Sequence, residues 1–167
     1  MTTTTSTRTV HVHRVYIRAT AQRVWDALLS PEWTDRYGYG GTVDYDLRPG
    51  APYVVKPGAA MREFPNVPDE IIDGEVIEAD PPRRLSLTWR MLMDPGMLAE
   101  GFTKLTYEIE ATESAGTRLT VIHELEGAPT LAAMVGGEAE AEGAGGGWAW
   151  ILSDLKSLLE TGSRLAD

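Results

Sequence analysis

The last helix places the strongest constraint on how this chain of 167 residues folds. Between residues 147 and 162, apolar residues recur at the three- and four-residue spacing of a helix with one apolar side. They are Trp148, Ile151, Leu152, Leu155, Leu158 and Leu159. Gly162 follows the last of them, where a left-handed cap would end the helix. Most of the preceding chain is typical of strands and turns, so the helix is expected to bury its apolar side against a sheet. If that sheet curls around the helix, the space between them becomes a pocket.

The strands are predicted from alternating apolar and polar residues. The clearest example covers residues 85–93, whose inward positions are Leu85, Leu87, Trp89, Met91 and Met93. Further strands are predicted over residues 10–18, 42–47, 53–56, 70–79, 102–111 and 117–125, with two short helices after the first strand, at 21–29 and from Pro31. Residues 57–68, 94–98 and 126–147 are expected to be connections, the last with one loose helical turn at most. One apolar and one polar face indicate an antiparallel sheet that is covered on one side.

The composition narrows the classes of function. No cysteine is present, which excludes disulfides, a thiolate nucleophile and a Cys-ligated metal, and fits a cytoplasmic location. A net charge of −10 opposes binding to nucleic acid or to anionic lipid. No apolar run approaches the roughly 20 residues of a membrane span, and residues 1–9 lack the apolar core of a signal peptide and are expected to be a disordered tail. Nucleophile-elbow, zinc-protease, phosphate-loop and dinucleotide-binding motifs are also missing, so no cofactor is expected.

Several strings along the chain resemble the START-like, helix-grip superfamily. They are Val15-Tyr16-Ile17-Arg18-Ala19-Thr20, Val24-Trp25-Asp26-Ala27-Leu28, residues 74–85, Thr88-Trp89, residues 116–123 and the terminal Gly147-Trp148 helix. Their order is similar to that of bacterial homologues of the heat-shock-protein-90 ATPase activator, often grouped with polyketide cyclases. The resemblance covers about residues 10–162 and implies a single α+β domain. In such a domain, a curved antiparallel sheet of about six to seven strands surrounds a long C-terminal helix.

The same resemblance implies several functions, because one fold hosts many activities. Relatives include lipid and hormone carriers, aromatase/cyclases, co-chaperone domains and enediyne self-resistance proteins. This chain departs from the usual pattern in its Glu/Ala/Gly segment, residues 138–147, which borders the pocket mouth in relatives. The ligand of a typical relative is therefore not transferred to it.

Inward-facing side chains are the candidate ligand-binding residues. They are Trp89, Met91, Met93, Tyr107, Val121, His123, Trp148 and Leu152. His123 is in phase with inward Leu119 and Val121, so it is either a polar anchor or base in the pocket or a hydrogen-bonded core histidine. The flexible thioethers of Met61, Met91, Met93 and Met97, with Phe64, suit a pocket that adapts to irregular apolar ligands, although core packing explains Met91 and Met93 equally well.

Other clusters have a structural explanation as well as a functional one. His11 and His13 share a face of the first strand, but a metal site needs a third ligand, so no metal is expected. Asp73, Glu75, Arg84 and Arg90 are expected to form cross-strand ion pairs on a solvated face. Trp33, Tyr37 and Tyr39 could be either a lid or plain cap packing.

The sequence favours non-covalent binding of a hydrophobic small molecule, of polyketide-like or aromatic kind, by a monomer or weak homodimer. No residue is assigned a catalytic role. Three alternatives remain open: a polyketide cyclase that uses His123 to polarise a ketone, a chaperone-activating interaction module, and a self-sacrificing enediyne resistance protein.

Overall fold

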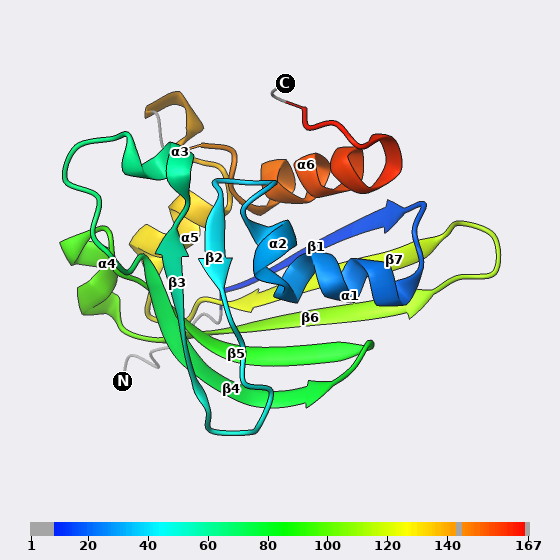
Figure 1. Cartoon of the computed structure of the whole chain (residues 1–167). Helices are drawn as coiled ribbons and strands as arrows, with labels where there is room; N and C mark the ends of the chain where they lie inside the picture. Colours follow the sequence, from blue (N-terminus) through cyan, green and yellow to red (C-terminus); the bar gives the residue numbers. More distant parts are fainter. Residues whose placement is uncertain (1–8, 143–144, 166–167) are drawn as a thin grey trace, which may run out of the picture.

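A computed structural model describes residues 9–142 and 145–165, and its strands form one curled sheet with helices on the inner side (Figure 1). The predicted tail lies mostly outside these described residues. In chain order the elements are β1 (Val10–Ile17), α1 (Ala21–Leu29), α2 (Pro31–Thr34), β2 (Gly41–Val43), β3 (Pro52–Pro57), α3 (Ala59–Arg62), β4 (Ile72–Asp80), β5 (Arg84–Met91), α4 (Pro95–Glu100), β6 (Thr103–Ala111), β7 (Thr117–Glu124), α5 (Pro129–Val135), the 3-10 turn η1 (Glu140–Glu142) and α6 (Gly147–Thr161).

The sheet is antiparallel throughout, with strand order β1-β7-β6-β5-β4-β3-β2. Figure 1 shows its curvature: β2 and β3 rise across the end of the other strands, and α1 and α6 lie on the enclosed side. The helix-grip class predicted from the sequence is therefore confirmed. None of the helices in residues 9–142 and 145–165 combines the length and hydrophobicity of a membrane span.

Helix α6 buries the predicted apolar side. Leu155 is completely buried, and Trp148, Leu152, Leu158 and Leu159 are each less than a tenth exposed. The helix ends as expected, because Gly162 adopts φ +81° and its N–H bonds to the Leu158 carbonyl at 2.9 Å. Burial of this apolar surface is the main free-energy gain from docking the helix.

The inner face of the sheet follows the predicted alternation. Its buried members include Leu85, Leu87, Trp89, Met91, Leu105, Ile109, Leu119, Val121 and His123. The opposite face is less exposed than the alternation predicted, since Ser86 and Thr106 are also buried and their hydroxyls bond to each other at 3.0 Å. A paired hydroxyl can be buried at little cost because its hydrogen bond to water is replaced.

The connections differ from the sequence prediction in four places. Short helices α3, α4 and α5 lie in segments predicted as loops. Helix α5 has a proline in its first turn and buries Leu131, Ala132 and Val135 on one side, a pattern that the Gly- and Ala-rich composition around it obscured. Strand β5 ends at Met91 instead of Met93, because Asp94 caps α4 immediately afterwards by accepting from the Met97 N–H. Strand β2 is shorter than predicted, so residues 44–51 form a wide connection to β3.

Candidate functional site

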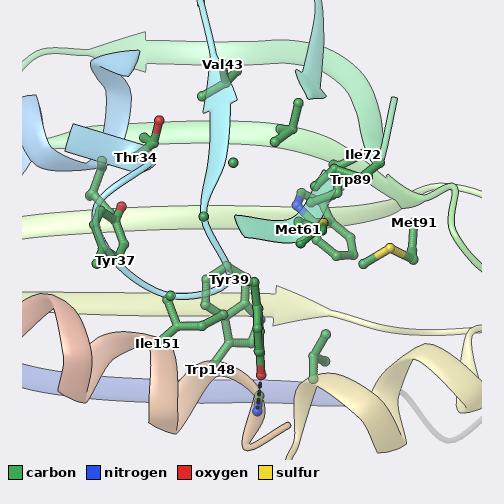
Figure 2. Close-up of a pocket in the computed structure, with 18 of the residues that line it drawn as sticks. Thr34, Tyr37, Tyr39, Val43, Met61, Ile72, Trp89, Met91, Trp148 and Ile151 are labelled. Carbon is green, nitrogen blue, oxygen red and sulfur yellow. Dashed lines mark hydrogen bonds between the residues drawn. The ribbon is translucent and has the colours of Figure 1, made fainter. Parts of the chain in front are cut away.

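A cavity of about 280 Å³ lies between the sheet and α6, with an apolar wall. The sheet contributes Trp89, Met91 and Tyr107, and α6 contributes Trp148 and Ile151 (Figure 2). The other walls consist of Leu28, Thr34, Tyr37, Gly38, Tyr39, Gly40, Gly41, Val43, Tyr45, Val55, Met61, Ile71, Ile72, Met93, Met134, Val135 and Gly147. The volume is close to the lower end of small-molecule sites, which run from roughly 300 to 1,000 Å³.

Residues 37–41 form one rim of the cavity, and two contacts hold this rim against α6. The Tyr39 hydroxyl accepts a hydrogen bond from the Gly147 N–H at 3.2 Å, and the Tyr39 ring stacks on Trp150 with centroids 5.3 Å apart. Figure 2 shows the Tyr39 hydroxyl directed toward the start of α6. Both contacts are made by the Tyr39 side chain, which therefore anchors the rim to the first turn of α6.

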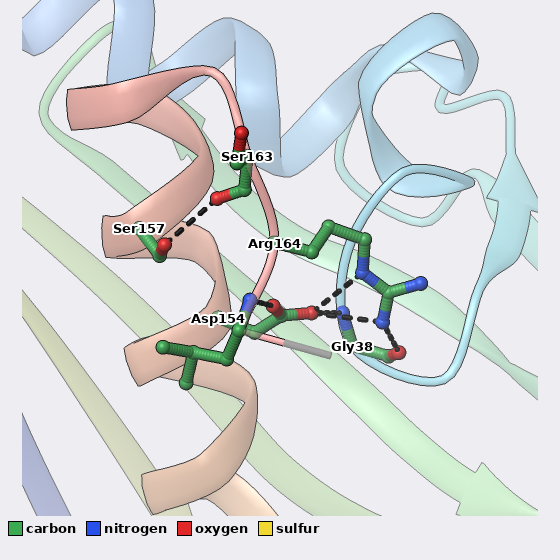
Figure 3. A network of polar contacts seen from close by, with 6 residues as sticks. Gly38, Asp154, Ser157, Ser163 and Arg164 are labelled. Atoms are coloured by element: carbon green, nitrogen blue, oxygen red, sulfur yellow. Dashed lines mark hydrogen bonds and ion pairs between the residues drawn. The ribbon is translucent and has the colours of Figure 1, made fainter. Parts of the chain in front are cut away.

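The second anchor of the rim is a buried carboxylate, Asp154 of α6 (Figure 3). It accepts hydrogen bonds from the Gly38 N–H at 2.9 Å, from the Leu165 N–H at 2.9 Å and from the Arg164 guanidinium at 2.9 and 3.0 Å. Arg164 also donates to the Gly38 carbonyl at 2.7 Å. Burial alone would raise the pKa of Asp154, but the bonds from Leu165, Arg164 and Gly38 outweigh it and lower that pKa.

His123 lies beside the cavity in a linear chain of hydrogen bonds that runs from Trp148 to the Trp89 carbonyl. The Trp148 indole N–H donates to its Nδ1 at 3.1 Å. An indole nitrogen can only donate, so Nδ1 accepts and the ring proton is on Nε2. That proton faces the Thr103 hydroxyl at 2.8 Å, and the hydroxyl in turn donates to the Trp89 carbonyl at 2.9 Å. Every polar atom of the histidine ring thus has a protein partner.

The surroundings keep this imidazole neutral. His123 is fully buried, and burial, with a smaller contribution from His11 and His13, lowers its pKa to about 3. Its ring also makes edge contacts with Trp89 and Trp148 at centroid distances of 5.2 and 6.1 Å. The neutral ring makes one hydrogen bond through each nitrogen and so connects α6 with β7, β6 and, through Thr103, β5. Neither nitrogen is free to bind a ligand.

The eight predicted ligand-binding residues separate into two groups. Trp89, Met91, Met93, Tyr107 and Trp148 line the cavity. Val121, His123 and Leu152 are buried beside it, outside its wall. Alternation identified the inward face of each strand, but it carries no information on which inward residues the helix covers and which remain open.

The other candidates from the sequence also have definite positions. Met61 reaches the cavity wall, whereas Met97 packs against the core and Phe64 is 68% exposed. Tyr37 and Tyr39 line the cavity, while the Trp33 ring lies under the guanidinium of Arg36 at 4.7 Å.

The charged and histidine pairs lie away from the cavity wall. Asp73 and Arg90 form the expected cross-strand ion pair, at 2.8 Å. His11 and His13 contact edge to face at 6.2 Å, and burial followed by the nearby His11 lowers the pKa of His13. Within the described part of the chain, no cluster of three or more His, Cys, Asp or Glu side chains is arranged to hold a metal ion.

Sequence reasoning missed several residues of the cavity wall. Tyr45 was assigned to a strand, and Met134 and Val135 lie in the segment that was predicted as a loop. An apolar i, i+1, i+4 pattern at Leu131, Ala132 and Val135 was the available signal for α5. Tyr45 had no comparable signal, because its position depends on the wide connection between β2 and β3.

A curled antiparallel sheet that encloses a C-terminal helix and an apolar cavity defines the helix-grip, START-like class. Residues 18–160 match the family model described as activator of Hsp90 ATPase homolog 1-like protein. The chain belongs to this family. A search of curated proteins with the sequence finds no match.

Solved structures share the fold at low sequence identity. Protein MLL2253 from Mesorhizobium loti is 19% identical, with a TM-score of 0.62 over 90% of this chain and 96% of that one. CalU16 from Micromonospora echinospora is 18% identical, with a TM-score of 0.62 over 95% of this chain and 79% of that one. DynU16, a protein of the dynemicin biosynthetic locus, is 19% identical, with a TM-score of 0.63 over 93% of this chain but only 48% of its own.

We predict that His123 makes stability depend on pH in acid. Its folded pKa of about 3 lies below the value of about 6.5 expected in the unfolded chain, so the unfolded chain binds more protons between these values. The free energy of unfolding is therefore unaffected by the titration of this group above pH 6.5, and it falls by about 1.4 kcal/mol per pH unit between pH 6.5 and about pH 3. Gln at this position can offer one acceptor and one donor but does not titrate. Urea unfolding at pH 7 and pH 5 should therefore show a loss about 2 kcal/mol larger in the wild type than in His123→Gln. Equal losses in the two proteins would contradict a neutral, buried His123.

We predict that Asp154→Ala lowers the free energy of unfolding by about 3 kcal/mol, because the substitution leaves the Gly38 and Leu165 N–H groups and Arg164 without their shared acceptor. Asp46→Ala is the matched control, since it removes an exposed ion pair with Arg48 and should leave the free energy of unfolding nearly unchanged. Urea unfolding of both variants at neutral pH measures the difference. Equal losses would mean that the buried network does not stabilise the rim.

Proposed function

We propose that this protein binds a hydrophobic small molecule, of polyketide-like or aromatic kind, in the cavity between α6 and the sheet. The observation that carries the proposal is the cavity itself, whose wall is built from aromatic, thioether and aliphatic side chains. A packed domain seldom leaves such a volume empty, because close contacts stabilise the core. A binding partner would recover part of that lost contact energy.

The side chains of the cavity wall favour ligand binding over acid–base catalysis. Among the described residues, the wall carries no carboxylate, amine, guanidinium or imidazole group. A cyclase that uses His123 would need that ring to face the ligand, whereas both of its nitrogens are engaged by Trp148 and Thr103. Likeness to DynU16 supports a role near secondary-metabolite biosynthesis or self-resistance. We further propose that the protein is cytoplasmic and acts as a monomer or weak homodimer, as expected from the sequence.

The test is titration with a panel of aromatic polyketides, followed by amide NMR. Saturable shifts should concentrate at residues of the cavity wall, including the Trp89, Met93 and Trp148 regions. The matched pair of variants is Ile151→Trp, which fills the cavity from α6, and Ser153→Trp, which adds the same side chain on the exposed face of that helix. We expect Ile151→Trp to weaken binding at least about tenfold and Ser153→Trp to leave it unchanged. A well-folded protein that responds to no member of the panel would refute the proposal.

A second candidate, self-sacrificing resistance to an enediyne, is favoured by one specific observation. Four glycines, Gly38, Gly40, Gly41 and Gly147, line the cavity and bring backbone Cα–H bonds to its wall. A diradical formed there could take a hydrogen atom from one of these carbons, and dioxygen would then trap the carbon radical and lead to a chain break.

This candidate predicts cleavage at a defined position. Incubation with an activated enediyne in air should give fragments whose masses fit a break at one of these glycines. The already cyclised, aromatic product of the same compound is the control and should leave the chain intact. An intact chain after complete consumption of the enediyne would exclude this function and leave non-covalent binding as the remaining proposal.

A further inference from the structure

The polar groups of the residues that line the cavity are uncharged. Within residues 9–142 and 145–165 they consist of the hydroxyls of Thr34 and four tyrosines, the indole N–H groups of Trp89 and Trp148, and backbone atoms of the glycine-rich rim. A charged ligand would lose its hydration without finding an opposite charge, which is costly in a largely apolar site. This composition selects for an uncharged ligand.

Three of these groups already have protein partners. The Tyr37 hydroxyl donates to the Ala27 carbonyl at 3.0 Å, the Tyr39 hydroxyl accepts from Gly147, and the Trp148 indole donates to His123. The Tyr37 hydroxyl and the Trp148 indole each use their one hydrogen in these bonds, whereas the Tyr39 hydroxyl is held against the start of α6 as an acceptor.

Two tyrosine hydroxyls of the wall, those of Tyr107 and Tyr45, have no hydrogen-bond partner among the described residues, and neither oxygen is sealed from its surroundings. Tyr107 is on β6, between β7 and β5, where its ring contacts that of Trp148 edge to face with centroids 6.2 Å apart. Tyr45 is held in the connection after β2 by its contact with the Tyr53 ring at 5.2 Å. Both rings are positioned by aromatic neighbours while their hydroxyls stay available.

Each of these free groups carries a hydrogen that it can donate. Burial raises the pKa of Tyr107 and of Tyr45, so both keep their protons throughout the physiological range. The Trp89 indole N–H, which can only donate, also has no acceptor among the described residues. The Thr34 hydroxyl also has no partner in the described chain, but its oxygen is buried and does not reach the cavity surface. A ligand that satisfies this set must supply an acceptor atom.

We propose that the cavity recognises a compact, uncharged, flat aromatic ligand through a carbonyl oxygen that accepts hydrogen bonds from Tyr107 and Tyr45. This inference rests on the proposed binding function and specifies its ligand class. The rings of Trp89 and Trp148 supply surfaces for a flat ligand, and the cavity volume of about 280 Å³ favours a compact one. A hydrocarbon of the same shape would leave the tyrosine donors without partners, which a buried donor tolerates poorly.

Fluorenone, fluorene and a fluorenone carboxylate test the inference, because they share one ring skeleton and differ in the carbonyl and the charge. Their affinities are measured by calorimetry with the full chain. We expect fluorenone to bind at least about tenfold more tightly than fluorene, and more tightly than the carboxylate. Equal binding of fluorenone and fluorene would overturn the inference and leave the proposed binding function standing. Tightest binding of the carboxylate would overturn the uncharged ligand class. Failure of all three to bind the folded protein would count against both.

The variants Tyr107→Phe and Tyr45→Phe separate a hydrogen bond from general packing. Each should lower the affinity for fluorenone, by about tenfold for Tyr107→Phe, while fluorene binds as well as before or more tightly. The control is Tyr53→Phe, which removes a hydroxyl that donates to the Thr88 carbonyl at 2.6 Å and lies outside the cavity wall. This control should keep the preference for fluorenone. Retention of the full preference in the Tyr107→Phe, Tyr45→Phe double variant would overturn the assignment of the two tyrosines.

Discussion

The hydrogen bond from the Trp148 indole to His123 fixes α6 relative to the sheet, and the rest of the structure depends on that placement. Hydrophobic burial determines which side of α6 faces the sheet, but it is non-directional and leaves the exact position of the helix along the sheet loosely specified. A directional bond to a buried imidazole does specify that position, because the ring is held in turn by Thr103. The cavity exists where it does because Trp148 is held at the wall and cannot move into the open space.

Close approach of backbones fixes the beginning of the same helix. Gly147 has φ +68°, and a Cβ added there would lie 2.1 Å from the Val135 carbonyl oxygen. Only glycine fits between the end of α5 and the start of α6 without displacing one of them. This contact keeps the Gly147 N–H in reach of the Tyr39 hydroxyl, so the helix start, α5 and the rim form one wall of the cavity.

Asp154 and His123 lie outside the cavity wall, where other protein groups satisfy their hydrogen bonds. The one buried carboxylate described above, Asp154, is surrounded by donors and lies behind the rim, and the buried histidine is fully engaged in the core. Among the described residues, the polar side chains of the cavity wall are all uncharged. The charged groups therefore stabilise the structure around the cavity. The uncharged hydroxyl and indole groups of the wall can form hydrogen bonds with an uncharged ligand.

Local patterns in the sequence were sufficient to predict the strands and the helices α1, α2 and α6. The apolar side of residues 148–159, the cap at Gly162 and the alternation of Leu85, Leu87 and Trp89 follow from local spacing, which reports the faces of helices and strands directly. Together with the resemblance to a known family, this was sufficient for the helix-grip fold and for five of the residues in the cavity wall. The same patterns did not predict that His123 lies outside the cavity wall while Tyr107, on the neighbouring strand, lines it. Nor did they predict that Tyr45, Met134 and Val135 line the cavity. These positions depend on the register of β6 and β7, on the path of the β2–β3 connection and on where α6 packs along the sheet. Each is set by contacts between residues far apart in the chain, which local spacing does not encode.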